Sequence, residues 1–228
     1  MLEYIRENYI ELCREIDEAV KKRGGGEVKL VSVTKSGTDE ELLSLIEAGA
    51  PDIGENRPQE LVRRGELLRQ NGHTPRLHEI GNLQKNKVRH IIESVYMIHS
   101  VDSLELAREI DKRAKAIERR VPILIEVNSG REEAKGGIMP EDAEALFLEI
   151  RELDSLIVSG IMTMGPLTDD PENLRPYFRS TRELFDHLNT KYGFEGEPTL
   201  SMGMSDSFRV AIEEGSTLVR VGSRIFKK

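Results

Sequence analysis

Apolar residues follow two spacings that alternate along the chain. A strand-like run that is rich in β-branched residues, 28–33, follows a segment with helical spacing. The segment before this run has apolar residues at spacings of three and four, and they predict an amphipathic helix over the first 22 residues. These positions are Leu2, Ile5, Tyr9, Leu12, Ile16 and Ala19. The same alternation of strand and helix patterns continues to the end of the chain.

The alternation predicts eight strands with a helix between each consecutive pair. The predicted strands are 28–33, 52–54, 76–81, 95–100, 121–127, 156–162, 198–203 and 217–222. The helices between them are expected to include 58–70, 84–92, 141–153, 173–191 and 206–214. Thr38 with Glu41, and the residues 102–105, have the pattern of capping boxes at two further helix starts.

This order of elements predicts an α/β fold, because strands that alternate with helices form parallel sheets. Eight units in a chain of 228 residues fit a single (β/α)8 barrel domain, 1–228, with an extra helix at its N-terminus. The alternative is an open, doubly wound sheet. That fold would place a glycine-rich phosphate turn after the first strand, where this chain has Thr34-Lys35-Ser36-Gly37.

Composition excludes several classes of function. The formal net charge of −8 and the absence of tryptophan argue against nucleic-acid binding, and no apolar run approaches the ~18 residues of a membrane helix. A single cysteine, Cys13, excludes a disulfide framework, and the five histidines lack metal-ligand spacing. We therefore expect a cytoplasmic protein without a metal site.

Lys35 directly follows the first strand, at the end of the barrel where this fold places its chemistry. One interpretation is an ordinary solvated lysine. The other is a partly buried amine with a lowered pKa, able to form a Schiff base with an aldehyde.

The loops after the last two predicted strands, 201–205 and 222–223, combine glycines with serines. In such barrels these loops often bind phosphate, since glycine lets backbone N–H groups approach an anion closely. Gly203 and Gly222 could each instead serve a simple turn. Their occurrence together in the two loops favours a phosphate site.

Arg220 lies inside the last predicted strand, where an unpaired cation would be costly to bury. It could pair with Glu126 or Glu213, or it could donate a hydrogen bond to the ring nitrogen of a ligand. A Schiff-base lysine, a phosphate site and a donor to a ring nitrogen together match pyridoxal 5′-phosphate (PLP).

At these positions the sequence resembles the YggS/PROSC-type pyridoxal-phosphate homeostasis proteins. The resemblance covers nearly the whole chain and is carried by VSVTKSGTDEELLSLIEAG, IGENRPQE, HEIGNLQKNKV, VSGIMTMGPL, LSMGMSDSF and GSTLVRVGSRIF. It implies the barrel of alanine racemase without the C-terminal β domain of that enzyme. Leu77 and Glu79 depart from the family, which commonly has aromatic residues there, and this would alter the wall of the pocket.

The resemblance implies a role for each matching residue. Lys35 corresponds to the lysine that forms the internal aldimine, and Arg220 to the arginine facing the pyridine nitrogen. Asn56 lies beside the cofactor in the family, and His78 and Gly81 belong to its segment under the ring. The remaining positions are expected at the phosphate or packed against the cofactor: Met162, Ser201, Met202, Gly203, Gly222 and Ser223.

The resemblance also implies a function. We expect a monomeric protein that binds PLP through Lys35 and buffers it or delivers it to PLP-dependent apo-enzymes, with little turnover and no catalytic residues. A PLP-dependent amino-acid racemase is the main alternative, and an aldolase-like barrel using Lys35 is a weaker one. A racemase needs a second base, and all five tyrosines fall on predicted helices or within a strand.

Overall fold

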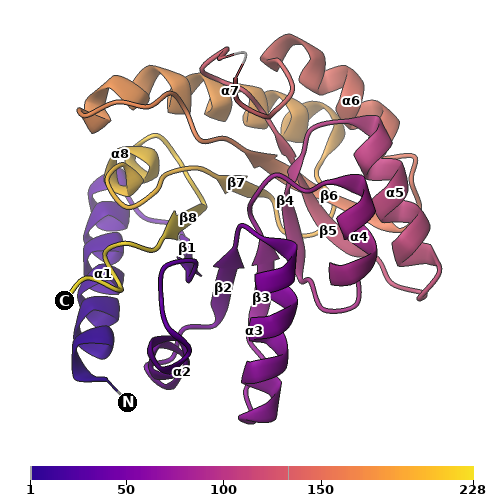
Figure 1. Ribbon diagram of the computed structural model, residues 1–228. Helices are drawn as coiled ribbons and strands as arrows, with labels where there is room; N and C mark the ends of the chain where they lie inside the picture. The colour runs from indigo at the N-terminus through magenta and orange to yellow at the C-terminus, as the bar shows by residue number, and fades with distance from the viewer. Residues whose placement is uncertain (1, 133) are drawn as a thin grey trace.

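A closed barrel of eight parallel strands forms the centre of the molecule in the computed structural model, which describes residues 2–132 and 134–228 (Figure 1). The strands are β1 (Lys29–Val33), β2 (Asp52–Glu55), β3 (Arg76–Glu79), β4 (Met97–Val101), β5 (Val121–Glu126), β6 (Leu156–Met162), β7 (Thr199–Ser201) and β8 (Leu218–Val221). Because β1 pairs with both β2 and β8, the sheet closes on itself. The predicted barrel is confirmed, and the open sheet is excluded.

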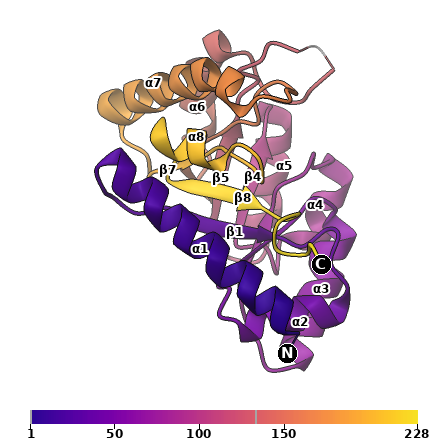
Figure 2. The same cartoon turned by 90° about the vertical axis from the view of Figure 1, so that its left-hand side faces the viewer.

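Helices surround the barrel. They are α1 (Glu3–Arg23), α2 (Asp39–Glu47), α3 (Pro58–Gln70), α4 (Lys85–Ile91), α5 (Leu104–Lys115), α6 (Ala143–Ile150), α7 (Arg175–Tyr192) and α8 (Phe208–Glu213), with short 3-10 turns at Pro140–Asp142 and Pro171–Leu174. The extra helix α1 packs between α8 and α2 on the outside of the barrel (Figures 1 and 2). No helix in the part of the chain that the structure describes is long and apolar enough to cross a membrane.

The two predicted capping boxes have different outcomes. At the start of α2 the Thr38 side chain accepts the backbone N–H of Glu41, and the Glu41 side chain accepts the N–H of Thr38, so this box is confirmed. At α5 the capping residue is Ser103, which accepts the N–H of Leu106. The third helical position is therefore a leucine, which has no carboxylate to return the bond, and the second box was wrong.

Several predicted elements are shorter than expected, and three of them show this most clearly. The helix predicted over 141–153 consists of the 3-10 turn at Pro140–Asp142 and then α6, which ends at Ile150. The strand predicted over 198–203 is limited to β7, because Gly203 has a φ of 94°, a left-handed conformation that leaves the strand. Helix α8 begins only at Phe208, after a turn in which Ser207 N–H donates to the Met204 carbonyl.

Two apolar regions with different positions stabilise the fold. The main core lies between the strands and the helices, and includes Ile53, Leu77 and Met202. Inside the barrel, Met97, Leu124 and Met162 form a separate small cluster with Met164 against it. Polar and charged side chains such as His78, His99 and Arg220 occupy much of the remaining barrel interior.

Candidate functional site

Lys35 lies on a tight turn directly after β1, and this turn is held from the helix layer. The buried Arg64 of α3 donates to the carbonyls of Thr34 and Gly37, at 2.6 and 2.7 Å, on either side of Lys35. The Thr34 hydroxyl donates to Glu55, and Arg64 pairs with the same carboxylate at 3.2 Å. The backbone that carries Lys35 is therefore fixed by buried, charge-assisted contacts.

Arg64 was missed in the sequence analysis, although the sequence contains a signal for it. Leu61 and Leu68 define the buried face of α3, and Arg64 lies three residues after one and four before the other. A charged residue on the apolar face of a helix requires a buried partner, and here the partners are Glu55 and the Lys35 turn.

The Lys35 side chain itself is exposed, whereas a partly buried amine was expected. It lines an open pocket of about 360 Å³ together with Ser36, Glu55, Asn56, Arg57 and Glu60. Within residues 2–132 and 134–228, its amine has no hydrogen bond or ion pair. The amine is accessible to a ligand that enters from solvent.

Close backbone contacts join the ends of four strands at this end of the barrel. A Cβ atom at Gly222, after β8, would lie 2.5 Å from the Val33 carbonyl oxygen of β1. A Cβ atom at Gly81, after β3, would lie 2.2 Å from the Asn56 carbonyl oxygen that follows β2. The structure thus brings the strand ends carrying Lys35, Asn56, Gly81 and Gly222 together, as the sequence predicted.

These contacts make Gly81 sensitive to the smallest substitution. In the variant Gly81→Ala, we expect the added methyl group to displace the backbone at Asn56 and to lower the free energy of unfolding by about 1–3 kcal/mol. Urea unfolding measures this change. The control is Gly136→Ala, where the nearest atoms would be 3.7 Å from the new Cβ. Equal stability of the two variants would show that the contact at Asn56 is not restrictive.

The two C-terminal loops form a cradle of backbone and hydroxyl groups. Gly222 N–H donates to the hydroxyl of Ser205 at 3.4 Å, which links the loop after β7 to the loop after β8. Ser223 is exposed, and in the described part of the chain its N–H and hydroxyl have no partner. Ser205 lies in the loop 201–205 but was not predicted as a site residue, and its contact with Gly222 adds it to the candidate phosphate site.

Ser201 does not belong to this cradle. It is fully buried, accepts a hydrogen bond from Arg220 at 2.5 Å and contacts the Nδ1 atom of His99 at 3.1 Å. Its side chain points into the barrel, where Arg220 of β8 and His99 of β4 contact it. The phosphate contact that the resemblance implied for Ser201 is therefore unsupported by its geometry, and Ser205 is better placed.

Arg220 is buried inside the barrel, and its guanidinium group has no direct ion pair among the described residues. It donates to Ser201 and, at 3.0 Å, to the Thr163 carbonyl. Burial lowers the pKa of Arg220 to about 10, an effect that the charge of Glu126 partly opposes, so the group stays protonated at neutral pH. Neither predicted ion pair forms as a direct contact, since Glu213 instead pairs with Arg175 and Lys22.

Two other residues that were predicted to contact the cofactor, His78 and Met202, do not line the Lys35 pocket. His78 is buried, and both its ring nitrogens have side-chain partners at 2.9 Å, Asp52 and His99. Met202 packs in the outer core, as does Leu77, so neither forms the inner wall of a pocket. Met162 does lie inside the barrel, with Met97 and Leu124.

Each of three groups of residues at this end of the barrel suits a different chemical feature of a ligand. The accessible Lys35 amine can attack an aldehyde carbon. The Ser223 N–H and the Ser205 and Ser223 hydroxyls can donate to a phosphate oxygen. Arg220, which has only donors, can hydrogen-bond an unprotonated ring nitrogen.

Comparison with known proteins gives the class of protein to which this parallel barrel belongs. Residues 9–228 match the family model described as alanine racemase, N-terminal domain. The fold also matches alanine racemase of Clostridium difficile 630, with a TM-score of 0.72 and 19% identity, over 93% of this chain and 58% of that one.

Closer relatives narrow this class. The chain is 42% identical over 222 residues to the pyridoxal phosphate homeostasis protein of Aquifex aeolicus, covering 96% of each. It is similar in structure to PipY of Synechococcus elongatus, solved with PLP bound, with a TM-score of 0.85 and 27% identity over 97% of this chain and 99% of that one. The chain therefore belongs to the pyridoxal phosphate homeostasis protein family.

Proposed function

We propose that this protein binds PLP covalently through Lys35 and serves as a carrier that buffers the cofactor or delivers it to PLP-dependent apo-enzymes. The observation that carries the proposal is the accessible amine of Lys35, which has no partner within the described residues, beside Asn56 and at the strand ends that also hold Gly222 and Ser223. The names of the relatives and the PLP-bound PipY structure support the same cofactor. We place this role in the cytoplasm and in a monomer.

The chemistry of Arg220 favours binding over turnover. An arginine donates a hydrogen bond but cannot give up its proton at neutral pH, so the ring nitrogen of PLP would stay unprotonated beside it. Bound PLP can act as an electron sink, and a protonated ring nitrogen strengthens that property. A site with Arg220 at this position would therefore stabilise a carbanion poorly.

The exposure of Lys35 favours exchange of the cofactor. An amine from solvent, such as a lysine of an acceptor enzyme, could reach the cofactor in the open pocket without a lid having to move. A carrier requires such access in order to load and to unload. A PLP-loaded sample mixed with a PLP-dependent apo-enzyme should restore the activity of that enzyme, whereas a sample of the Lys35→Ala variant treated identically should restore much less, because it holds PLP only weakly.

A racemase is the second candidate, because the family model is that of alanine racemase. Such an enzyme needs a second base opposite Lys35. In the described residues no tyrosine lines the Lys35 pocket, and Tyr9 and Tyr96 line pockets at the opposite end of the barrel.

Proton exchange separates the two candidates. The PLP-loaded protein is incubated with L-alanine in heavy water, and loss of the α-proton is followed by NMR. We expect no sustained exchange above that of free PLP. Continued turnover that also yields D-alanine would establish a racemase and overturn the carrier.

A further inference from the structure

A line of buried polar side chains runs through the barrel from Arg220 to the opposite end. Arg220 Nη1 lies 2.5 Å from Ser201 Oγ, and Ser201 Oγ lies 3.1 Å from His99 Nδ1. His99 Nε2 then lies 2.9 Å from His78 Nδ1, and His78 Nε2 lies 2.9 Å from Asp52 Oδ1. All five side chains are at most 4% exposed. They come from five different strands, β8, β7, β4, β3 and β2.

When both histidine rings are neutral and Asp52 is ionised, only one arrangement of protons satisfies every contact in this line. The Asp52 carboxylate can only accept, which fixes the direction of donation along the line: His99 Nδ1 accepts the hydroxyl proton of Ser201, and the Ser201 oxygen accepts from Arg220, which can only donate. A neutral His99 then carries its proton on Nε2 and donates to His78, which donates in the same way to Asp52. Burial lowers the pKa of His78 and, more strongly, that of His99, which keeps both rings neutral.

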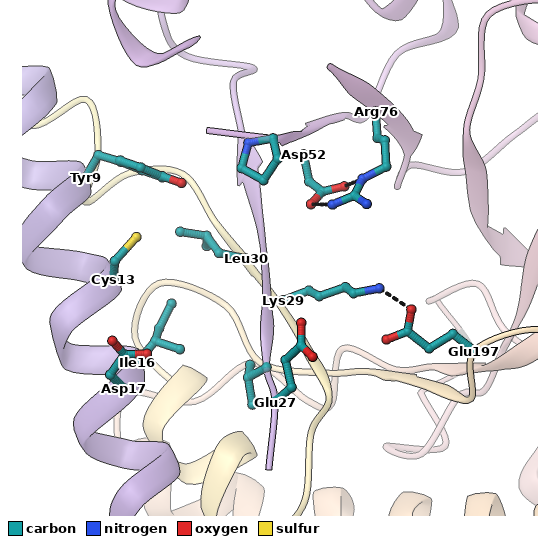
Figure 3. A pocket seen from close by; sticks show the side chains of 12 residues that line it. Tyr9, Cys13, Ile16, Asp17, Glu27, Lys29, Leu30, Asp52, Arg76 and Glu197 are labelled. Carbon is teal, nitrogen blue, oxygen red and sulfur yellow. Dashed lines mark hydrogen bonds and ion pairs between the residues drawn. The ribbon is translucent and has the colours of Figure 1, made fainter. Parts of the chain in front are cut away.

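The far end of the line carries a negative charge. Burial alone would raise the pKa of Asp52, but the hydrogen bonds from His78 and Arg76 outweigh it and lower that pKa. Arg76 binds both carboxylate oxygens, at 2.6 and 2.7 Å. Asp52 and Arg76 line a pocket of about 460 Å³ at the N-terminal end of the barrel, beside the Lys29–Glu197 pair (Figure 3).

The line also accounts for the buried charge of Arg220. A buried guanidinium without an anionic partner is strongly unfavourable, and Arg220 has no direct one among the described residues. Hydrogen bonds in a chain polarise one another, so the Asp52 carboxylate increases the negative character of each acceptor up to Ser201. Ser201 thereby accepts from Arg220 more strongly than an isolated hydroxyl would.

We propose that Asp52, His78 and His99 are positioning residues that act through Ser201 on Arg220, so that a carboxylate at one end of the barrel controls the contact with the cofactor ring at the other. The inference rests on the proposed function in one respect, that Arg220 faces the ring of bound PLP. A purely structural line would merely satisfy polar groups in the barrel interior. The two cases differ in whether a change at Asp52 reaches the cofactor.

The test measures the rate of PLP release and the visible absorbance of bound PLP in Asp52→Asn, Ser201→Ala and the double variant. The asparagine keeps an acceptor for His78 but removes the charge. We expect each single variant to shift the band and to change the release rate by about 2- to 30-fold, the range typical of coupling between distant sites. The double variant should match Ser201→Ala alone, because the line is already cut.

Two controls separate an effect carried by the line of side chains from other effects. Glu197→Gln removes a charge from the same pocket outside the line, and should leave the band and the release rate unchanged. Ser201→Thr keeps a hydroxyl and should restore the parental band. If the effects of Asp52→Asn and Ser201→Ala simply multiply in the double variant, Asp52 acts independently of Ser201, and the proposal is refuted.

Histidine NMR of the PLP-free parent protein provides a readout that requires no substitution. The proposal requires that both His78 and His99 carry their proton on Nε2. A proton on Nδ1 of either ring would break the line and overturn the proposal, even if the variants did not fold. Failure of the parent protein to develop the visible band with PLP would instead count against the proposed function, and the NMR result would still decide whether the line exists.

Discussion

Replacing Lys35 with alanine should abolish the visible absorbance that the parent protein gains on adding PLP. A methyl group cannot form the carbon–nitrogen double bond, whereas the contacts of Ser205, Ser223 and Arg220 with a non-covalent ligand would persist. We therefore expect complete loss of the band, with weak residual binding detectable by equilibrium dialysis. Lys35→Arg should behave in the same way, since it restores the positive charge but not a reactive amine.

Two further measurements make this test specific to Lys35. Lys112→Ala, which changes an exposed lysine of α5, should keep the full band. Borohydride reduction of the loaded parent protein, followed by peptide mapping, should place the adduct on Lys35. An adduct on another lysine, or a persistent band in Lys35→Ala, would show that Lys35 is not the anchor.

The sequence predicted the fold well wherever local signals determine an element. Helix α3 begins at Pro58 and ends at Gln70 as expected, because its apolar spacing is regular and proline favours the first helical turn. Strand β6 also has the predicted bounds. The second capping box was wrong because Ser103 and not Asp102 caps α5, and a local pattern does not choose between two adjacent residues that both favour the capping position.

The site was predicted in part, for a similar reason. Lys35, Gly222 and Ser223 follow strands directly, so the barrel alone brings them to one end. The partners of His78 and Ser201 depend on which side chains meet across the barrel. His99 joins a residue 21 positions earlier to one 102 positions later, and no local pattern specifies such contacts.

Free energy of unfolding should fall as the pH rises from 7 to 8, and Glu79→Gln should remove this fall. Glu79 is fully buried, and burial, opposed by the Gly81 N–H and reinforced by Glu55, raises its pKa from 4.5 to about 8. Between these values the folded state keeps the proton that the unfolded chain releases. Stability therefore falls with rising pH, by up to about 1.4 kcal/mol per pH unit.

Other buried groups confine this effect to the range from pH 7 to 8. His78 and His99 have lowered pKa values, so the unfolded chain binds more protons below pH 6.5 and stability there rises with pH. Burial raises the pKa of Glu126 to about 7, and its contribution levels off above that value. Between pH 7 and 8, the ionisation of Glu79 therefore dominates the dependence of the free energy of unfolding on pH.

The measurement is urea unfolding of the PLP-free protein at several pH values between 7 and 8. Glu79→Gln replaces a carboxyl group that must stay protonated with a neutral amide, so at pH 8 the variant should be more stable by on the order of 1–3 kcal/mol. Glu149→Gln, which alters an exposed carboxylate of α6, should keep the parental slope. An unchanged slope in Glu79→Gln would mean that Glu79 is ionised in the folded state, and that the Gly81 N–H and the surrounding dipoles suffice to stabilise its charge.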